Sequence, residues 1–593
     1  MSESLLSYFE QELRFIREEA EAFSERHPGA ASALGLHRES VDDPQIARLI
    51  ESVAFLNGRL QKRLDDNFPA LTEDLIRLLY PHFLRPVPAF SMLKVELDDD
   101  ANARHHIPAL TEFDVKEGET QAVFRTTSEL AIYPFEFESL DVSLAPFEIE
   151  KPRGAENAKA LIELDVVAKD EGIVMRDLDI TSLDVQLRGD VNLILRLYDL
   201  LFHGINQIAM TTPSGQRYVL GADALTPIGF EPEQSVLPYP ATSFGGFKLL
   251  TEFFVFSERF HAFRIDLSAI AAKLDSDRFT VEIYLDDMSV ELVRGLALSN
   301  FALYCTPVIN LQQAVSEPMQ IDFLQNRYPI VMDAGDDERY ELFAINHVTD
   351  VTDAGEVSVP AVYGDKYTPS QTGLRWQLQQ FHRESGVLSS ALNVADLDNS
   401  SPDSSPRIWQ VNALCSNGRL AAQLSSTSSV VCRETITIPG TPMLLRRPSM
   451  PAYNRDIQRN SWALLAHLHF NYHTILGAEN PAETLQALFK LYNHNDASKN
   501  EAYIAAISLI EQEQVVAPIR VQRKSCFAYG TRIVVTLNTS ELVGGVVLFS
   551  HLLDRFFAYF AGFNSFTQLD VVIEGQEGVY LSFPRRSGCK TLL

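Results

Sequence analysis

The sequence predicts an α+β protein, in which an N-terminal helical region is followed by β-rich domains and then by a mixed α/β C-terminal domain. Over the first 90 residues, apolar side chains recur every three or four positions, which is the period of one helix face. From there to about residue 440 the period is close to two, as in half-buried strands. Helical patterns then return between strands. These changes divide the chain into segments at 1–90, 91–295, 296–440 and 441–593.

The first expected helix carries a narrow apolar stripe. Its members are three or four residues apart, as in the seam of a coiled coil, and the motif His27-Pro28-Gly29 ends the helix. The stripe consists of Leu5, Phe9, Leu13, Ile16, Ala20 and Phe23.

A second helix is expected to begin at Pro44, because proline suits the first helical position and Asp43 before it can act as the cap. Gly58 lies inside this helix, at a cost of about 0.8–1 kcal/mol relative to alanine. Either it lets another helix approach closely, or it has no special role. The apolar stripe of this helix is Ile46, Leu49, Ile50, Val53, Leu56, Leu60 and Leu64.

A third helix is expected after Pro69, and it ends before the prolines at 86 and 88. Two β-rich regions follow, the second with long loops. The polar stretch "ADLDNSSPDSSPR", which ends at Arg407, is expected to be a loop. The stretch "QLSSTSSVV" at 423–431 is either a loop or a strand rich in Ser and Thr.

The stretch at 542–566 is one of the most apolar in the chain, so it could be a membrane span or a core helix. Asp554 and Arg555 interrupt it, and each costs about 2.5–3.5 kcal/mol at the centre of a membrane helix. Leu548, Leu552 and Phe556 recur at helical spacing. We therefore predict a buried helix, followed by a strand over "FTQLDVVIE".

The composition is strongly acidic. The chain contains 50 Lys and Arg residues and 79 Asp and Glu residues, which gives a net charge of −29. This balance argues against nucleic acid and anionic lipid as partners. The five cysteines are widely spaced and indicate a reducing compartment, and the first residues are acidic where a signal peptide is basic. We expect a cytoplasmic protein without direct membrane insertion.

The most suggestive catalytic pattern is the trio His467, His469 and His473. The last two lie one helical turn apart and could share a metal ion, so a metal-dependent enzyme is the alternative function. The chain has no H-E-x-x-H motif, phosphate-binding loop, dinucleotide fingerprint or nucleophile elbow. We therefore predict a non-enzyme without catalytic, cofactor-binding or metal-binding residues.

Several motifs together resemble the TssF family, a baseplate component of the bacterial type VI secretion system. They are "YFEQELRFIREEAEAF", "DDPQIARLIESVAFLNGRLQKRLDDNFPAL", "LIRLLYPHFLRPVPAFS", "GFKLLTEFFVFSERFHAFRIDL" and "FPRRSG", in that order. The resemblance implies a structural subunit of a contractile, phage-tail-like injection machine. It implies assembly with TssG, TssE, TssK and a second TssF copy into wedges that surround the VgrG hub. The resulting baseplate docks on the cytoplasmic face of the inner membrane. The baseplate is the platform for sheath and tube assembly.

We predict that the two apolar stripes bind partner chains in a helical bundle. Burial of a Leu or Phe side chain contributes about 1.5–3 kcal/mol. The alternative is that the stripes pack against the chain's own β-domain. The prolines at 86 and 88 are expected to provide a flexible joint behind this region. The predicted partner-binding residues are Leu5, Phe9, Leu13 and Ile16 of the first helix, and Leu49, Val53, Leu56 and Leu60 of the second.

Overall fold

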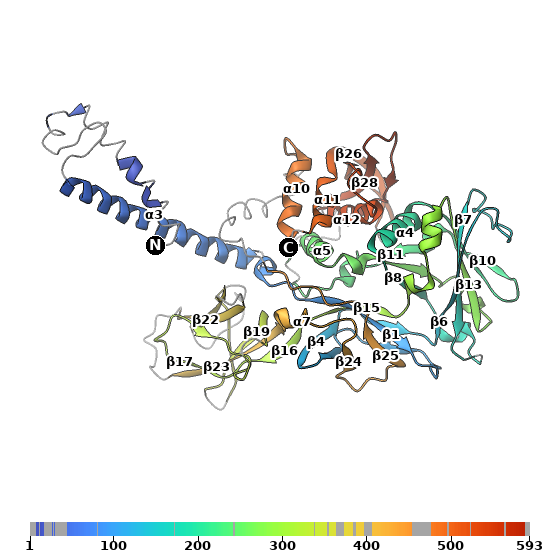
Figure 1. Cartoon of the computed structure of the whole chain (residues 1–593), viewed down its shortest axis with the longest axis horizontal. Coiled ribbons are helices and arrows are strands. Elements are labelled where there is room, and N and C mark those ends of the chain that lie inside the picture. Colours follow the sequence, from blue (N-terminus) through green and yellow to red (C-terminus); the bar gives the residue numbers. More distant parts are fainter. Residues whose placement is uncertain are drawn as a thin grey trace. The chain divides into compact units, whose positions relative to one another are not determined.

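The chain folds into two compact units, seen in a computed structural model (Figure 1). Unit 1 comprises Met1–Leu84 and Arg455–His469, and unit 2 comprises Arg85–Asn454 and Phe470–Leu593. Many helices and strands occur together, so the predicted α+β class is confirmed, while the four-segment layout stays a prediction. The structure describes residues 8–10, 12–16, 26–27, 29, 44–79, 81–170, 172–240, 243–336, 339–352, 355–362, 373–383, 387–396, 406–453, 476–494, 497–521, 524–561 and 565–587.

Unit 1 is dominated by the helix α3 (Pro44–Leu79), which is followed by the short 3₁₀ helix η1 (Pro81–Leu84). The helix begins at Pro44 as predicted. The predicted break at Pro69 is wrong, because α3 continues through this residue for 36 residues in all. A proline removes one bond of the hydrogen-bond ladder, and turns on both sides can carry the helix past it.

Gly58 of α3 is the contact point for the helical residues 8–10 and 12–16, which we call the front segment. A Cβ atom at Gly58 would lie 3.0 Å from the backbone nitrogen of Phe9 and 3.1 Å from its Cα. The rings of Phe9 and Phe55 meet edge to face at 6.4 Å, and Ala54 is fully buried. Of the two roles considered for Gly58, close approach of another helical segment is therefore confirmed.

Replacing Gly58 with alanine should loosen this contact. The neighbouring atoms belong to the backbone, so the front segment must move as a body, at a cost of about 1–3 kcal/mol. That loss exceeds the gain in helix propensity of about 0.8–1 kcal/mol. Hydrogen exchange of the amides at 12–16 should become faster. Asn57→Ala, at the exposed neighbouring position, is the control and should leave exchange unchanged or slower. Equal exchange in both variants would contradict the assigned role of Gly58.

Unit 2 contains a six-stranded antiparallel sheet built from distant parts of the sequence. The sheet crosses the boundaries expected from the sequence, and "QLSSTSSVV" ends in one of its edge strands. In spatial order the strands are β24 (Ser429–Cys432), β3 (Glu112–Glu117), β4 (Thr120–Thr126), β15 (Cys305–Ile309), β1 (Phe90–Leu97) and β25 (Gly440–Leu444).

The segment in front of β1 is anchored inside unit 2. Residues 86–88 are buried, and Val87 exchanges two backbone hydrogen bonds with Ala452, at 2.8 and 2.9 Å. Val87 and Ala452 both belong to unit 2, which begins just before them at Arg85. The flexible joint at 86–88 stays a prediction.

Between residues 105 and 302, unit 2 also contains a five-stranded sheet, a four-stranded sheet, a pair of short strands and three α-helices. The five-stranded sheet has the order β10 (Arg217–Val219), β9 (Ile205–Thr211), β13 (Arg278–Leu285), β7 (Ala160–Ala168) and β6 (Phe135–Leu144). The four-stranded sheet has β11 (Leu225–Pro227), β12 (Ala262–Asp266), β8 (Ser182–Leu187) and β14 (Phe301–Ala302). The helices are α4 (Val191–His203), α5 (Gly245–Val255) and α6 (Val290–Gly295), and β2 (His105–Ile107) pairs with β5 (Leu130–Ile132).

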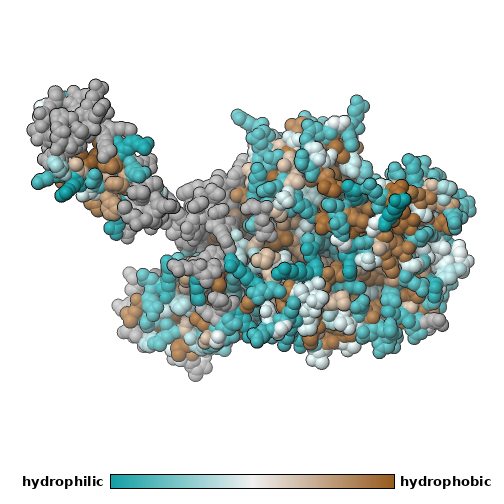
Figure 2. Space-filling view, in the orientation of Figure 1, coloured by the Kyte–Doolittle hydropathy of each residue, from teal (hydrophilic) through white to brown (hydrophobic). Residues whose placement is uncertain are grey.

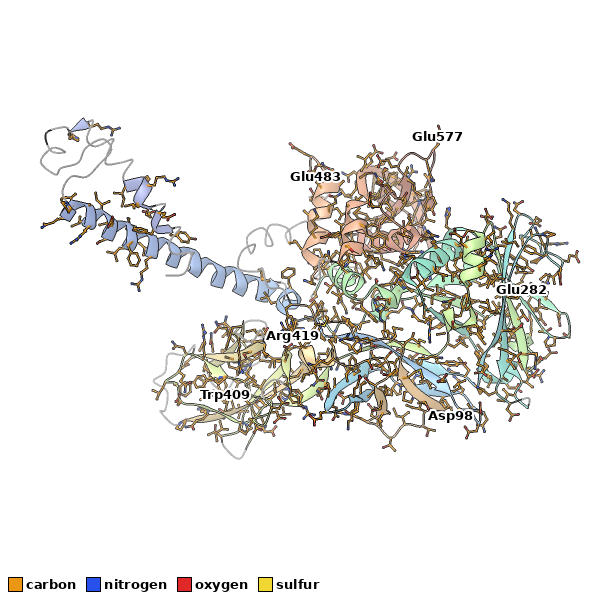
Figure 3. All side chains as sticks on the ribbon, viewed as in Figure 1. Asp98, Glu282, Trp409, Arg419, Glu483 and Glu577 are labelled. Carbon is orange, nitrogen blue, oxygen red and sulfur yellow. The ribbon has the colours of Figure 1, made fainter. Side chains whose placement is uncertain are left out.

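A second β-rich region follows in the sequence, around the fully buried Trp409 (Figure 3). Its larger sheet has β16 (Gln312–Val315), β23 (Arg407–Ser416), β19 (Glu341–Asp350) and β20 (Val357–Val359), with β17 (Met319–Ile321) also paired to β23. Its smaller sheet has β18 (Tyr328–Pro329), β22 (Leu388–Asp396) and β21 (Leu374–His382). The short helix α7 (Gly418–Ala421) follows β23.

The C-terminal part combines helices with strands. Strands β27 and β28 are parallel, and α12 provides the crossover between them. Its elements are α10 (Pro481–Tyr492), α11 (Ser498–Ala505), β26 (Ile507–Val521), β27 (Lys524–Leu537), α12 (Val546–Ala558), β28 (Ser565–Ile573), β29 (Leu581–Ser582) and β30 (Arg586–Ser587).

Helix α12 confirms the predicted core helix, because Leu548, Leu552 and Phe556 are fully buried. Asp554 is also buried and forms ion pairs with Arg555 at 2.7 Å and Arg586 at 2.5 Å, which explains how charges fit in this apolar stretch. Among the described residues, no helix combines the length and the hydropathy needed to cross a bilayer.

The start of α12 is capped by a side chain from another helix. Asp199 of α4 accepts hydrogen bonds from the backbone nitrogens of Gly545, Val546 and Val547, at 2.7, 3.2 and 2.9 Å. These are the N–H groups that a helix start leaves unpaired. Burial raises the pKa of Asp199 to about 6, although these hydrogen bonds act in the opposite direction. Asp199 thus joins α4 to the core helix.

Candidate functional site

Helix α3 presents a row of exposed apolar side chains. Leu49 is 63% exposed, Val53 40%, Leu56 61% and Leu60 58%. Their spacing of four, three and four residues places them on one side of the helix. Brown, apolar residues are visible on the described part of unit 1 in Figure 2. Single exposed apolar residues are common, but a row of four on one helix indicates a contact surface. We call these four residues the α3 stripe.

The opposite side of α3 is already occupied. At 3.6 residues per turn, Ala54 and Gly58 lie across the helix from Leu56 and Leu60. These two small residues are buried, and Gly58 contacts the front segment. Helix α3 is therefore two-sided: one side packs within unit 1, while the α3 stripe faces solvent.

The structure divides the eight residues predicted to bind partners. The four on α3 lie together and are exposed. Phe9, Leu13 and Ile16 of the front segment are half-buried, and Phe9 contacts Phe55 of the same chain. Leu5 lies outside the described residues. The neighbour of the front segment is thus α3 of the same unit. Binding of this segment to partner chains and its packing on the β-domain both stay predictions.

The alternative catalytic site cannot be placed, because His467, His469 and His473 lie outside the described residues. Within the part that is described, no group of three or more His, Cys, Asp or Glu side chains is arranged to hold a metal ion. Burial raises the pKa of both Cys305 and Cys415 to about 12, so neither thiol is a ready nucleophile.

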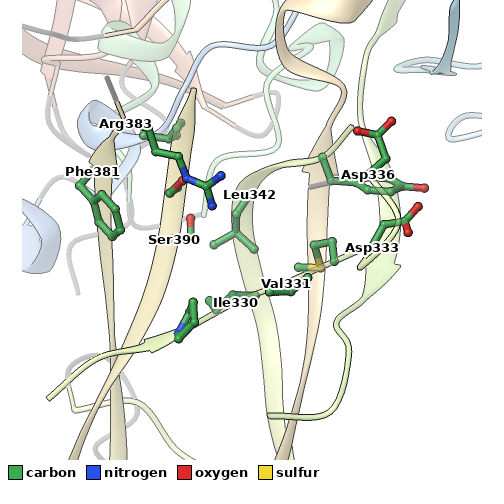
Figure 4. A pocket seen from close by; sticks show the side chains of 13 residues that line it. Ile330, Val331, Asp333, Asp336, Leu342, Phe381, Arg383 and Ser390 are labelled. Atoms are coloured by element: carbon green, nitrogen blue, oxygen red, sulfur yellow. The ribbon is translucent and has the colours of Figure 1, made fainter. Parts of the chain in front are cut away.

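A hollow in the second β-rich region lies between Phe381 and Arg383 on one side and Asp333 and Asp336 on the other (Figure 4). It encloses about 60 Å³, which is room for a few water molecules. Sites for organic ligands usually measure about 300–1,000 Å³. The hollow is therefore too small to indicate a substrate.

The most deeply buried ion pair joins Glu252 of α5 to Arg259, with 2.5 Å between Oε2 and Nη2. Both side chains are at most 2% exposed. They also hold the loop at 229–237, so the pair is a structural brace with no access for a substrate. Glu252 accepts hydrogen bonds from Ser235, Val236 and Leu237, and Arg259 donates to the carbonyl oxygens of Gly229 and Gln234.

His551 of α12 is enclosed by aromatic rings, and its Nε2 has no hydrogen-bond partner among the described residues. Burial, and secondarily the charge of Arg586, lowers the pKa of His551 to about 3. Burial also lowers the pKa of His261 to about 3. Both imidazoles are therefore neutral core groups. The rings around His551 belong to Tyr198, Phe202, Phe230 and Phe583, with centroids 5.2–6.1 Å away.

Comparisons with known proteins found similar sequences and similar folds. The TssF1 component of the type VI secretion system of Pseudomonas aeruginosa is 23% identical over 623 residues, which covers all of both chains. The fold is similar to a chain in the TssK–TssF–TssG baseplate subcomplex solved by cryo-electron microscopy, with a TM-score of 0.74 and 20% identity over 92% of this chain and 99% of that one. It is also similar to a chain of the type VI baseplate complex, with a TM-score of 0.59 and 22% identity over 98% and 100%.

The resemblance found in the sequence motifs is confirmed by a family model described as "Type VI secretion system, TssF", which matches residues 1–590. This match spans both units and both apolar stripes. The chain belongs to the TssF family of the type VI secretion system.

Proposed function

We propose that the chain is a structural subunit of a type VI baseplate, where it assembles with TssG and TssK. The support is the family itself, together with two similar folds from baseplate complexes, one of them named for TssK and TssG. The proposal extends to wedges that also contain TssE and a second copy of the chain and that surround the VgrG hub. It places the assembly in the cytoplasm, at a baseplate docked on the inner membrane.

The α3 stripe is the observation that carries this proposal. Its four side chains are 40–63% exposed and are aligned on a helix whose other side is already packed. Such a face is suited to partner helices, because full burial of a Leu side chain contributes about 1.5–3 kcal/mol. We therefore assign the stripe to a helical bundle formed with TssG.

The test is a double variant, Leu56→Glu with Leu60→Glu, co-expressed with TssG from the same secretion system. Both residues are about 60% exposed, so the isolated chain should remain folded. The interface would then bury two unpaired carboxylates, and we expect TssG to be lost from the purified complex. Arg48→Glu is the charge control, because Arg48 is exposed and lies outside the stripe.

A double variant that unfolds like the unmodified chain and still binds TssG would refute the assignment of the stripe. Positions on α3 give a cleaner test than Leu13 or Ile16. Those two residues are half-buried, so a charge there could act on the fold of unit 1 instead of on binding.

A further inference from the structure

Strands β26 and β27 form a long hairpin, and within the described part of the chain helices cover only its inner half. Ile533, Val535 and Leu537 of β27 are fully buried. Helix α10 packs against β26 and helix α12 against β28, within the same sheet (Figure 1). These three buried residues alternate along β27, so they identify the face of the sheet that the helices cover.

The same face continues outward, beyond the helices, as an exposed apolar surface. Thr531, Tyr529 and Phe527 follow Ile533 at every second position. Thr531 is buried and accepts a hydrogen bond from Gln514 at 3.1 Å, which marks the end of the core. Beyond it, Tyr529 is 75% exposed and Phe527 is 78% exposed.

The opposite strand completes this surface. Val516, 59% exposed, pairs with Tyr529, and the exposed Pro518 pairs with Phe527. We call these four residues the hairpin patch. The other face of the hairpin is anchored at this point, because Ala517, Ala528 and Phe566 form a small buried cluster. The patch is therefore held in place by packing on its reverse side.

The hairpin differs in charge from the rest of the chain. Residues 514–540 contain no Asp or Glu, although the whole chain has 79 of them and a net charge of −29. Arg532 is neutralised by Asp570, at 2.6 Å. The same segment of the sequence contains Arg520, Arg523 and Lys524. An acidic partner fits this surface, whereas most of the chain would repel one.

We propose that the hairpin patch is a docking surface for an acidic amphipathic helix of another subunit. A helix fits because the same sheet face accepts helices α10 and α12 farther in, and because helices commonly cover such faces. Aromatic residues with neighbouring basic charge are typical of binding hot spots. The aromatic rings project from the face of the sheet and not from the hairpin end, which favours a helix over a lipid surface. This inference depends on the proposed function, since it requires a multi-subunit assembly.

Photo-crosslinking at the patch tests the inference. Phe527 is replaced by benzoyl-phenylalanine in the full chain, which is assembled with TssG and TssK, and cross-linked peptides are identified by mass spectrometry. We expect one helical segment of another subunit with a net negative charge. Leu509 is the matched control, because it is 49% exposed on the same hairpin but on the opposite face. The same photoreactive residue at Leu509 should not label that segment.

A binding measurement complements the cross-link. The double variant Phe527→Ser, Tyr529→Ser should keep its thermal unfolding temperature, since both rings are exposed, and should bind the labelled subunit at least about tenfold more weakly. Absence of a cross-link, labelling of a basic or extended segment, or unchanged affinity would overturn the inference. Flotation of the purified chain with phosphatidylglycerol vesicles, lost in the double variant, would also overturn it and indicate a lipid surface.

Failure here can be separated from failure of the proposed function. If the hairpin variant assembles normally while the Leu56→Glu, Leu60→Glu variant loses TssG, only the docking surface is wrong. If the unmodified chain binds neither TssG nor TssK, the proposed function fails as well.

Discussion

Replacing Arg259 with methionine should lower the free energy of unfolding by about 3–5 kcal/mol. The substitution leaves the carboxylate of Glu252 buried without its cation, and it frees two carbonyl oxygens in the loop at 229–237. Desolvation of an unpaired charge is the dominant cost, since methionine is similar in length and apolar. Urea unfolding monitored by circular dichroism measures the change.

Two controls make this prediction specific. Arg264→Met breaks an ion pair with Asp184 in which both side chains are more than 40% exposed, so its cost should stay below about 1 kcal/mol. Adding Glu252→Gln to Arg259→Met should recover part of the loss, because the remaining charge is removed. If Arg259→Met and Arg264→Met lower the free energy of unfolding equally, burial of the Glu252–Arg259 pair does not cause the loss of stability.

The variant His551→Leu should gain stability relative to the unmodified chain as the pH falls. The folded state keeps the pKa of His551 at about 3, whereas an unfolded histidine has a pKa of about 6.5. Above pH 6.5 the imidazole is neutral in both states. Below it, the unfolded state binds a proton that the folded state does not. The contribution of His551 to the free energy of unfolding therefore falls by about 1.4 kcal/mol per pH unit.

Between pH 7 and pH 5 the difference between the two proteins should therefore move by about 2 kcal/mol in favour of His551→Leu. Urea titrations at both pH values measure it. His347→Leu, a change at an exposed histidine of β19, controls for the loss of an imidazole as such. A difference that does not depend on pH would show that His551 titrates normally in the folded protein.

Comparison with a variant is needed because other buried groups act in the opposite direction. Burial raises the pKa of Asp199 and of Asp554 to about 6, against about 3.9 in an unfolded chain. The folded state therefore binds their protons first as the pH falls from 6 to 4, which stabilises it. This gain offsets the loss from His261 and His551 in that window. The pH profile of the unmodified chain alone would hide both effects.

Single elements were predicted correctly from local patterns. The start of α3 at Pro44 and the buried helix α12 follow from a helix-start signal and from helical spacing, both of which act over a few residues. The expected break at Pro69 was wrong. Proline disfavours the helix interior at one position, but the turns on both sides keep α3 continuous there. Partner choice in the six-stranded sheet was not predictable, because β1 pairs with strands far along the chain.

The candidate site was predicted in part for the same reason. Spacing alone identified an apolar stripe on the second predicted helix, and the four of its residues that make up the α3 stripe are exposed together. Spacing could not decide which stripe packs within the chain. Packing of the front segment depends on the contacts of Phe9 with Gly58 and Phe55 of α3. These contacts join two separate segments, so the pattern within either segment does not reveal them. No sequence motif marks the ion pair between Glu252 and Arg259. Its importance comes from the burial of both side chains, which only the folded structure shows.

The position of β1 affects how the protein is made. Its partners are β15 on one side and β25, which ends at Leu444, on the other. During translation β1 leaves the ribosome long before either partner strand has been synthesised. In that interval a largely apolar strand has unpaired backbone N–H and C=O groups on both edges. Open edges of this kind pair readily with other chains. Synthesis that stops before Gly440 would therefore leave a product prone to aggregation, and the last third of the chain is needed to close a sheet that its first hundred residues begin.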